Sequence, residues 1–390
     1  MTAETVAEHD VVLCVGDTTF LDYGSIKAKT EGYGPIGKGG NGLILHSALA
    51  IEPQNGESLG LLWQKLWNRE SKPKPPVHET PTQKKQRQAQ ARIKARNRPF
   101  EQKESYKWVE ALSTVESLVS HHTRVIHVFD REGDITEVFD KIRQLQHTGI
   151  LVRAAHNRSI DSDSERLWSK LIAQPSSFEQ EIELPQTGQR SARKTKLAVR
   201  FCPLNLRTPY RFDNRDPLPV YAVYATEIDC PEGETLIEWM LLTTEVVADI
   251  QTASTILRWY TYRWRVEEYH KIFKSGCQVE KYRLAADGMK TLIGFLSVIA
   301  VELLRLTYLH RTQPLALAIE ILNPLELKIL KAKSPKPPKI LTINWAVEAV
   351  ARLGGYLEHR SKTPIGIQVL WRGWLKLHDL CEGWQLAKDT

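Results

Sequence analysis

The residues best suited to chemistry lie in the segment YTYRWRVEEYHKIFK, Tyr260 to Lys274. Because an α-helix turns by about 100° per residue, a helix here gathers five side chains within or beside an arc of roughly 60°. They are Tyr260, Arg263, Glu267, Lys274 and, at the edge, Lys271. One carboxylate among cations suits a site in which the acid holds a metal ion and the cations grip phosphate oxygens. The alternative is a solvated helix face with i,i+4 ion pairs.

Two upstream segments each carry an acid at the end of an apolar run. Val11–Val15 precedes Asp17 in GDTT, and Val125–Phe129 precedes Asp130 in FDREGDI. Such runs are typical of buried strands, and ligand sites in open α/β sheets collect at the carboxyl ends of strands. Either strand alone is a weak signal. Together with Glu267 they predict a three-carboxylate site whose oxygen ligands suit Mg²⁺ or Mn²⁺.

These motifs resemble those of the DDE transposases of the IS-four family, most closely the Tn-five type. The similarity runs from Val11 to about Gly383 and includes the late stretches ARLGGY and LWRGW. It implies a ribonuclease-H-like core in which Asp17 bridges two metal ions, Mg²⁺ or Mn²⁺, while Asp130 and Glu267 flank them. It also implies cut-and-paste DNA transposition through strand cleavage, a hairpin intermediate and strand transfer.

The resemblance implies DNA contacts as well. Tyr260, Arg263 and Lys274 are expected to grip phosphates beside the scissile bond, with Lys271 beside them. Arg131, next to Asp130, is expected to assist, and an ordinary surface arginine is the alternative. Trp239, twenty-one residues before Tyr260, matches a tryptophan that receives a flipped base during hairpin formation. A core position in EWMLLTT is the alternative for this ring.

Two further acids near these motifs are interpreted as structural. Asp134 starts a helical pattern and is expected to cap that helix. Glu268 lies one residue, or about 100°, off the proposed face and is excluded as a metal ligand.

Composition favours an anionic partner and a cytoplasmic location. The formal net charge is +7 and the pI is about 9.0, which favours nucleic acid. Five cysteines without a CxxC pair indicate neither a zinc module nor a disulfide framework. The most apolar stretch, Thr291–Val301, is broken by Glu302 and is too short to span a bilayer, and no signal peptide is visible. A bacterial cytoplasmic protein, nucleoid-associated when bound to DNA, is expected.

The order of patterns predicts an α/β fold with a β-rich insertion and a C-terminal helical unit. The predicted parts are 1–154, the first part of the core with a basic excursion at 72–102; 155–247, the insertion; 248–311, the second part of the core; and 312–390, helices that are a possible dimerisation unit. Within the excursion, QKKQRQAQARIKARNR holds seven cations and no acid. It is interpreted as a phosphate-contacting arm, with a solvated linker as the alternative.

The function expected from these observations is a DDE transposase acting on double-stranded DNA as a homodimer in the DNA complex. The family normally carries a helical DNA-binding domain before the first catalytic strand, whereas sixteen residues precede Asp17, so that domain is expected to be missing. A non-catalytic regulator that inhibits a full-length transposase by mixed dimerisation is therefore an alternative. A plain metal-dependent nuclease is another.

Overall fold

The computed structural model describes residues 2–24, 26, 31–37, 39–71, 78–184, 192–357 and 365–389. These residues form a mixed α/β protein with a group of C-terminal helices, which confirms the predicted α/β class. The chain divides into two compact units. Unit 1 comprises Met1–Asp17, His46–Lys65 and Ser71–Trp264; unit 2 comprises Thr18–Leu45, Leu66–Glu70 and Arg265–Thr390. Residues 72–77 of the predicted basic excursion lie outside the described residues.

The described strands belong to one sheet, in the order β2-β3-β1-β5-β6-β12-β11-β10-β7-β8, with β4 paired to β3 and β9 to β10. The strands that form its first half and centre are β1 (Val11–Asp22), β2 (Gly34–Gly37), β3 (Gly40–Ile51), β4 (Ser58–Trp67), β5 (Arg124–Phe129) and β6 (Thr148–Arg153). The remaining strands are β7 (Ser159–Ile160), β8 (Ser162–Arg166), β9 (Phe178–Leu184), β10 (Arg193–Leu206), β11 (Leu218–Ile228) and β12 (Glu238–Thr243). Strands β1, β3 and β4 contribute residues to both units.

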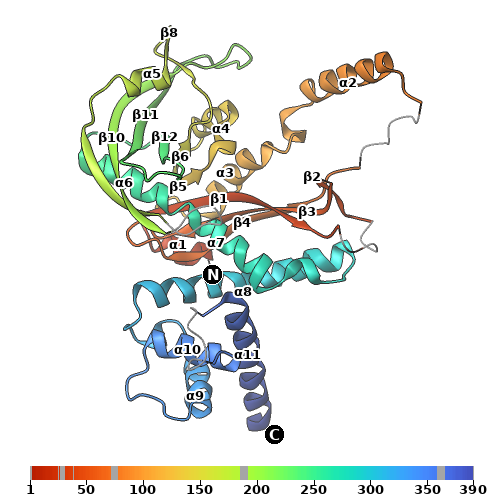
Figure 1. Cartoon of the computed structure of the whole chain (residues 1–390), viewed down its shortest axis with the longest axis vertical. Helices are drawn as coiled ribbons and strands as arrows, with labels where there is room; N and C mark the ends of the chain where they lie inside the picture. Colours follow the sequence, from red (N-terminus) through yellow and green to blue (C-terminus); the bar gives the residue numbers. More distant parts are fainter. Residues whose placement is uncertain are drawn as a thin grey trace. The chain divides into compact units, whose positions relative to one another are not determined.

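The centre of unit 1 is parallel. Strand β1 pairs with β5, and β5 with β6, in parallel register. The apolar runs predicted as buried strands are β1 and β5, and their Val, Leu and Ile side chains are buried on both faces, as parallel strands covered by helices require. Beyond β6 the sheet becomes antiparallel through β12, β11 and β10, the strands expected in the insertion (Figure 1).

Unit 1 also contains six described α-helices. They are α1 (Thr2–Ala7), α2 (Pro81–Arg96), α3 (Tyr106–Leu118), α4 (Thr136–Ile142), α5 (Leu167–Ile172) and α6 (Ile250–Thr261). Trp108 of α3 and Phe139 of α4 join Phe129 of β5 in one hydrophobic cluster, and the ring centroids of Trp108 and Phe129 lie 4.7 Å apart. This packing holds the end of β5, and hence Asp130, in place. Helix α2 alone in this group buries none of its residues.

His127 is a buried polar residue in the middle of β5. It is fully buried, and within the described residues neither ring nitrogen has a hydrogen-bond partner. Burial lowers the pKa of His127 to about 3, because the charged imidazolium cannot be solvated there. The native protein therefore holds this histidine neutral at pH values where the unfolded chain, with a pKa near 6.5, already binds a proton.

We expect the free energy of unfolding to fall as the pH drops below about 6.5. Because the unfolded state binds the proton first, His127 alone should remove about 2 kcal/mol at pH 5 relative to pH 8. Urea unfolding at pH 8 and pH 5 measures this loss. His127→Leu, which replaces an unpaired polar ring with an apolar side chain of similar volume, should reduce the loss by that amount. An unchanged pH dependence in the variant would contradict this assignment.

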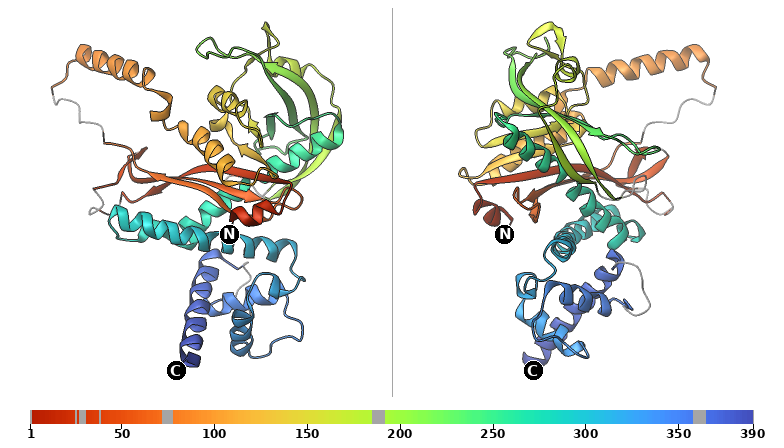
Figure 2. Two further views of the ribbon diagram at one scale, coloured as in Figure 1. Left: turned by 180° about the vertical axis from the view of Figure 1, so that it is seen from behind. Right: turned by 60° about the vertical axis from the view of Figure 1, so that its left-hand side comes forward.

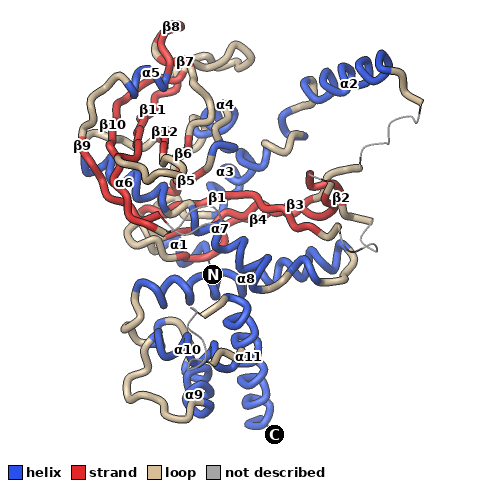
Figure 3. The backbone as a smooth tube through the Cα atoms, in the orientation of Figure 1, coloured by secondary structure: helices blue, strands red, loops and turns tan. Residues whose placement is uncertain are grey.

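Unit 2 is mainly helical (Figure 3). Its helices are α7 (Trp264–Lys271), whose first residue belongs to unit 1, α8 (Ala286–Thr312), α9 (Pro324–Lys333), α10 (Ile343–Leu353) and α11 (Ile367–Asp389). Gly354 and Gly373 allow α10 and α11 to approach closely, since a Cβ on Gly373 would lie 1.9 Å from the carbonyl oxygen of Val350. These glycines belong to the ARLGGY and LWRGW stretches, so both stretches have a packing role.

The tryptophans of this unit are mostly core residues, as the sequence predicted. Trp345, Trp371 and Trp374 are buried, whereas Trp384 is 36% exposed. Helix α8 is longer than the expected apolar stretch at Thr291–Val301. It spans 27 residues, and by length and composition it could cross a membrane. Half of its most apolar window is buried within the protein, which is the pattern of a core helix, so this single helix is weak evidence for a membrane.

Candidate functional site

Three polar side chains lie in one row across the parallel centre of unit 1. Val15 of β1 is paired with Val128, and Phe129 of β5 with Val152. Continuing these registers places Asp17 beside Asp130, and Asp130 beside Arg153, on neighbouring strands. Residues in register on parallel strands face the same side of the sheet. The two acids predicted from the sequence therefore come together, although β1 does not end near Asp17 as expected but continues to Asp22.

Arg263 lies against both acids. Its Nη1 is 4.0 Å from Oδ2 of Asp17, and its positive charge also acts on Asp130. Burial raises the pKa of Asp130, while the backbone N–H of Glu132, which donates to Oδ1 at 2.8 Å, and Arg263 oppose that rise. A buried carboxylate whose charge is only partly compensated is stabilised by a further cation.

The segment from Tyr260 to Lys274 is not one helix, so the prediction of a single helical face is wrong. Helix α6 ends at Thr261 and α7 begins at Trp264. At the joint, two backbone hydrogen bonds each connect residues three positions apart. The N–H of Tyr262 donates to the carbonyl oxygen of Trp259, and the N–H of Arg263 donates to that of Tyr260. The chain then passes through a π-helical turn at Ile272–Gly276, which carries Lys274.

The joint between α6 and α7 is held by the loop between β3 and β4. The hydroxyl of Tyr262 donates to the carbonyl oxygen of Gln54 at 3.3 Å. A Cβ on Gly56, which has a φ of +80°, would lie 2.6 Å from the Tyr262 ring. Since only glycine fits there, the loop fixes Tyr262 and with it the neighbouring Arg263.

Tyr260 is buried beside two guanidinium groups. It is 4% exposed, and burial raises its pKa, while the charges of Arg263 and Arg153 act in the opposite direction. Arg153 donates from Nη2 to the carbonyl oxygen of Glu238 at 2.8 Å, and burial lowers its pKa. Arg153 was not among the residues predicted from the sequence. The signal was present, because GILVR is an apolar run that ends in a charged residue just as VIHVFD does.

Trp239 occupies the environment of a core residue. It is 3% exposed, and its ring meets those of Tyr260 and Trp264 edge to face at 5.1 Å and 6.1 Å. In this structure the ring is thus covered by aromatic side chains, which matches the alternative that the sequence left open. A stacking contact with a flipped base requires those rings to move.

Further cations surround Asp130. Arg131 begins the short 3₁₀ turn that follows Asp130, and its charge acts on Arg153. Lys107 of α3 is 8% exposed and places its Nζ 3.2 Å from Oε2 of Glu132. Lys107 was also missed, since a lysine in an apolar helix carries no distinctive spacing. The site in unit 1 is therefore a pair of carboxylates among several cations.

The other predicted site residues belong to unit 2. Glu267 lies in the first turn of α7 and Lys271 is its last residue, whereas Lys274 lies 3.8 Å from Glu280. Glu268 binds Arg265 at 2.8 Å and Arg311 at 3.0 Å. Burial acts to raise the pKa of Glu268, but the two arginines lower it overall. Glu268 is thus engaged in ion pairs with two arginines.

Asp134 is not the helix cap that was expected. Helix α4 begins after Ile135 without a side-chain cap. Asp134 is fully buried and accepts hydrogen bonds from the backbone N–H groups of Ala155 and His156 and from Arg158. The Asp134 carboxylate therefore binds groups from a distant segment instead of capping its own helix. These hydrogen bonds hold the chain that follows Arg153.

The donor set fits a hard divalent cation in part. Asp17 and Asp130 supply carboxylate oxygens from one side of the sheet, the ligand type that Mg²⁺ and Mn²⁺ prefer. Over the described ranges, no group of three or more His, Cys, Asp or Glu side chains is placed to hold a metal ion. The two acids of unit 1 alone are fewer than the three carboxylates predicted from the sequence.

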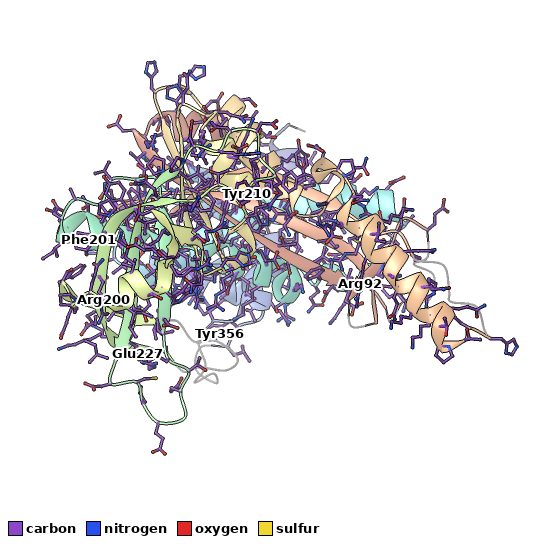
Figure 4. The ribbon with its side chains drawn as sticks, turned by 90° about the horizontal axis from the view of Figure 1, so that it is seen from above. Arg92, Arg200, Phe201, Tyr210, Glu227 and Tyr356 are labelled. Atoms are coloured by element: carbon purple, nitrogen blue, oxygen red, sulfur yellow. The ribbon has the colours of Figure 1, made fainter. Side chains whose placement is uncertain are left out.

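A second candidate surface in unit 1 is helix α2, which stands clear of the sheet in all views (Figures 1 and 2). Thr80 and Gln83 form a capping box and Pro81 opens the helix, so the local sequence specifies its start. Figure 4 shows its side chains spreading outward, Arg92 among them. A helix that is polar all round cannot pack into a core, and this one is rich in cations.

We expect removal of charge from α2 to flatten the salt dependence of DNA binding. Each lost phosphate contact should change the slope of log affinity against log salt by about 0.9, because fewer counterions are released. Arg87 is kept, since it pairs with Glu79 at 2.6 Å. The changed residues, each replaced by Gln, are Lys84, Lys85, Arg92, Lys94 and Arg96.

A matched control removes the same charge from the exposed lysines of α9 and the segment after it. These are Lys328, Lys331, Lys333, Lys336 and Lys339. Fluorescence anisotropy with a labelled duplex at several salt concentrations measures both slopes. Equal slopes in the two variants would show that only the net charge matters, and would return α2 to the linker interpretation.

No model of a known protein family matches the chain.

Proposed function

We propose that this protein is a DDE transposase with a ribonuclease-H-like core, which cleaves and joins DNA strands. One observation carries the proposal: Arg263 lies 4.0 Å from Asp17, and its charge also acts on Asp130, which directly follows β5, the parallel neighbour of β1. Paired carboxylates bordered by arginines suit phosphodiester chemistry, in which metal ions and cations share the charge of the phosphate. The same residues carry the resemblance in the sequence.

Asp17 and Asp130 would hold the metal ions, and Glu267 is proposed as the third ligand on the strength of the resemblance. Two Mg²⁺ or Mn²⁺ ions, when bound, would supply the activated water and stabilise the leaving oxygen. Arg263 and Arg153 would orient the phosphate for in-line attack through directed hydrogen bonds. Tyr260 would act through these arginines, because its hydroxyl is buried beside them.

The partner in this proposal is double-stranded DNA. The net charge of +7 and the exposed cations of α2 support it, since phosphate contacts dominate such affinities. A homodimer in the DNA complex and a place at the bacterial nucleoid belong to the same proposal.

Nicking of a supercoiled plasmid tests the function without knowledge of the transposon ends. The purified chain is expected to convert the plasmid to open circles in Mn²⁺, and EDTA should stop the reaction. Nicking that persists in EDTA, or no nicking at protein concentrations that saturate the DNA, would contradict the proposal.

A further inference from the structure

A cavity of about 370 Å³ lies within unit 2 and contains none of the residues assigned above. Its walls come from the segment between α7 and α8 and from the first turns of α11. The residues that matter for its chemistry are Gln278, Lys281, Tyr282, Gln368, Trp371 and Arg372.

The charge of this cavity favours an anion. Lys281 and Arg372 are exposed cations, and among the described residues that line the cavity none is acidic. The neighbouring acid, Glu280, is engaged elsewhere: it lies 3.8 Å from Nζ of Lys274 and accepts the backbone N–H of Asp22 at 2.9 Å. Two cations with no carboxylate between them suit a phosphate group.

The other lining groups suit a planar base attached to that phosphate. Trp371 is 8% exposed and so held firmly, and Tyr282 is half-buried. The half-buried Tyr282 ring offers a surface for stacking, while the amides of Gln278 and Gln368 can donate and accept hydrogen bonds. The volume lies in the range of small-ligand sites and is far larger than a bare phosphate needs.

The backbone of the cavity is held in an uncommon conformation. Gln278 has φ +51° and ψ +41°, the left-handed region that glutamine seldom adopts. Two backbone hydrogen bonds fix the loop on either side of Gln278. The N–H of Cys277 donates to the carbonyl oxygen of Ile272 at 2.8 Å, and the N–H of Lys281 donates to that of Gln278 at 2.9 Å. Residues in rarely populated backbone conformations concentrate at ligand sites, where the surrounding structure holds them in that conformation.

We infer that this cavity binds a nucleoside phosphate, with Lys281 and Arg372 on the phosphate and Tyr282 on the base. Two sources share this chemistry: a free mononucleotide, and the terminal nucleotide of a DNA strand. The inference does not depend on strand cleavage, because all the residues involved lie in unit 2 and binding is measured by itself.

Isothermal titration calorimetry of the full chain with dAMP tests the inference. Lys281→Gln and Arg372→Gln should each weaken binding at least about tenfold, the loss expected for a charge-assisted hydrogen bond. Lys376→Gln, an exposed cation of α11 outside the cavity, is the matched control and should bind as the unchanged protein does. Thermal unfolding of each variant verifies that it is folded.

Two comparisons separate the parts of the inference. Tyr282→Leu should weaken dAMP but leave inorganic phosphate unaffected, and equal affinity for dAMP and inorganic phosphate would overturn the role of the base. A tetranucleotide with and without a 5′-phosphate separates the sources: tighter binding of the phosphorylated strand than of dAMP identifies a strand end. No binding of either ligand, or equal losses in the Lys376→Gln control, would overturn the inference.

Discussion

Asp130→Asn is expected to reduce metal-dependent strand cleavage by at least about 10³-fold while the protein remains folded. Removing one carboxylate ligand forfeits several kcal/mol of charge stabilisation in the transition state, and each 1.36 kcal/mol is a factor of ten in rate. The amide oxygen of Asn can still accept the N–H of Glu132, so the turn after β5 is preserved.

Asp130→Asn should not lower the thermal stability of the protein, although it lowers the cleavage rate. Because burial raises the pKa of Asp130, the ionised side chain opposes folding at neutral pH, and an uncharged amide removes that cost. We therefore expect an equal or slightly higher melting temperature in the absence of metal. Plasmid nicking in Mn²⁺ and thermal unfolding of the same preparation measure both effects.

Asp22→Asn is the matched control for this experiment. Asp22 ends the strand that carries Asp17, and its Oδ1 accepts the N–H of Gly24 at 2.9 Å, a bond that Asn retains. Its cleavage rate should stay within about twofold of the unchanged protein. Glu267→Gln tests the third ligand in the same assay, and full activity in that variant would remove Glu267 from the proposal.

Trp239→Ala is expected to lower the free energy of unfolding by about 3–5 kcal/mol, the usual cost of truncating a buried tryptophan. The ring packs against Tyr260 and Trp264, so its loss leaves a cavity beside these two rings. Urea unfolding measures the change. Nicking and hairpin yields should then decline together, in proportion to the loss of native protein.

Trp384→Ala gives the comparison for an exposed ring. Trp384 is 36% exposed and contacts Lys328 by a cation–π interaction at 4.5 Å, worth about 0.5–1 kcal/mol. Trp384→Ala should therefore lower the free energy of unfolding by about 0.5–1 kcal/mol. If Trp239→Ala were as mild as Trp384→Ala and selectively lost hairpin formation, the base-stacking role would replace the core role.

The strands and the two acids on them could be predicted from the sequence because buried parallel strands leave a continuous apolar run. Val11–Val15 and Val125–Phe129 show this directly, and the register then follows from the pairing of β1 with β5. Arg153 likewise follows an apolar run, on β6. It was not predicted because only acidic residues were considered at the ends of such runs.

The break between α6 and α7 could not be read from periodicity. A helical period continues across Tyr262 and Arg263, whereas the break arises from short local bonds and from the contact between Tyr262 and Gly56, some two hundred residues away in the chain. Asp134 shows the same limit, since its partners lie after β6 rather than in its own helix. Contacts between distant segments leave no local pattern.

Helix α2 buries none of its residues, so its side chains need not fit a packed core as those in the rest of unit 1 must. Substitutions there can accumulate with little effect on folding, and natural selection can act on them only through charge and helix formation. If the proposed DNA contact holds, α2 is a place where DNA affinity can evolve independently of the core. For the same reason it is a convenient position for a fluorescent label or an engineered change in ionic-strength response.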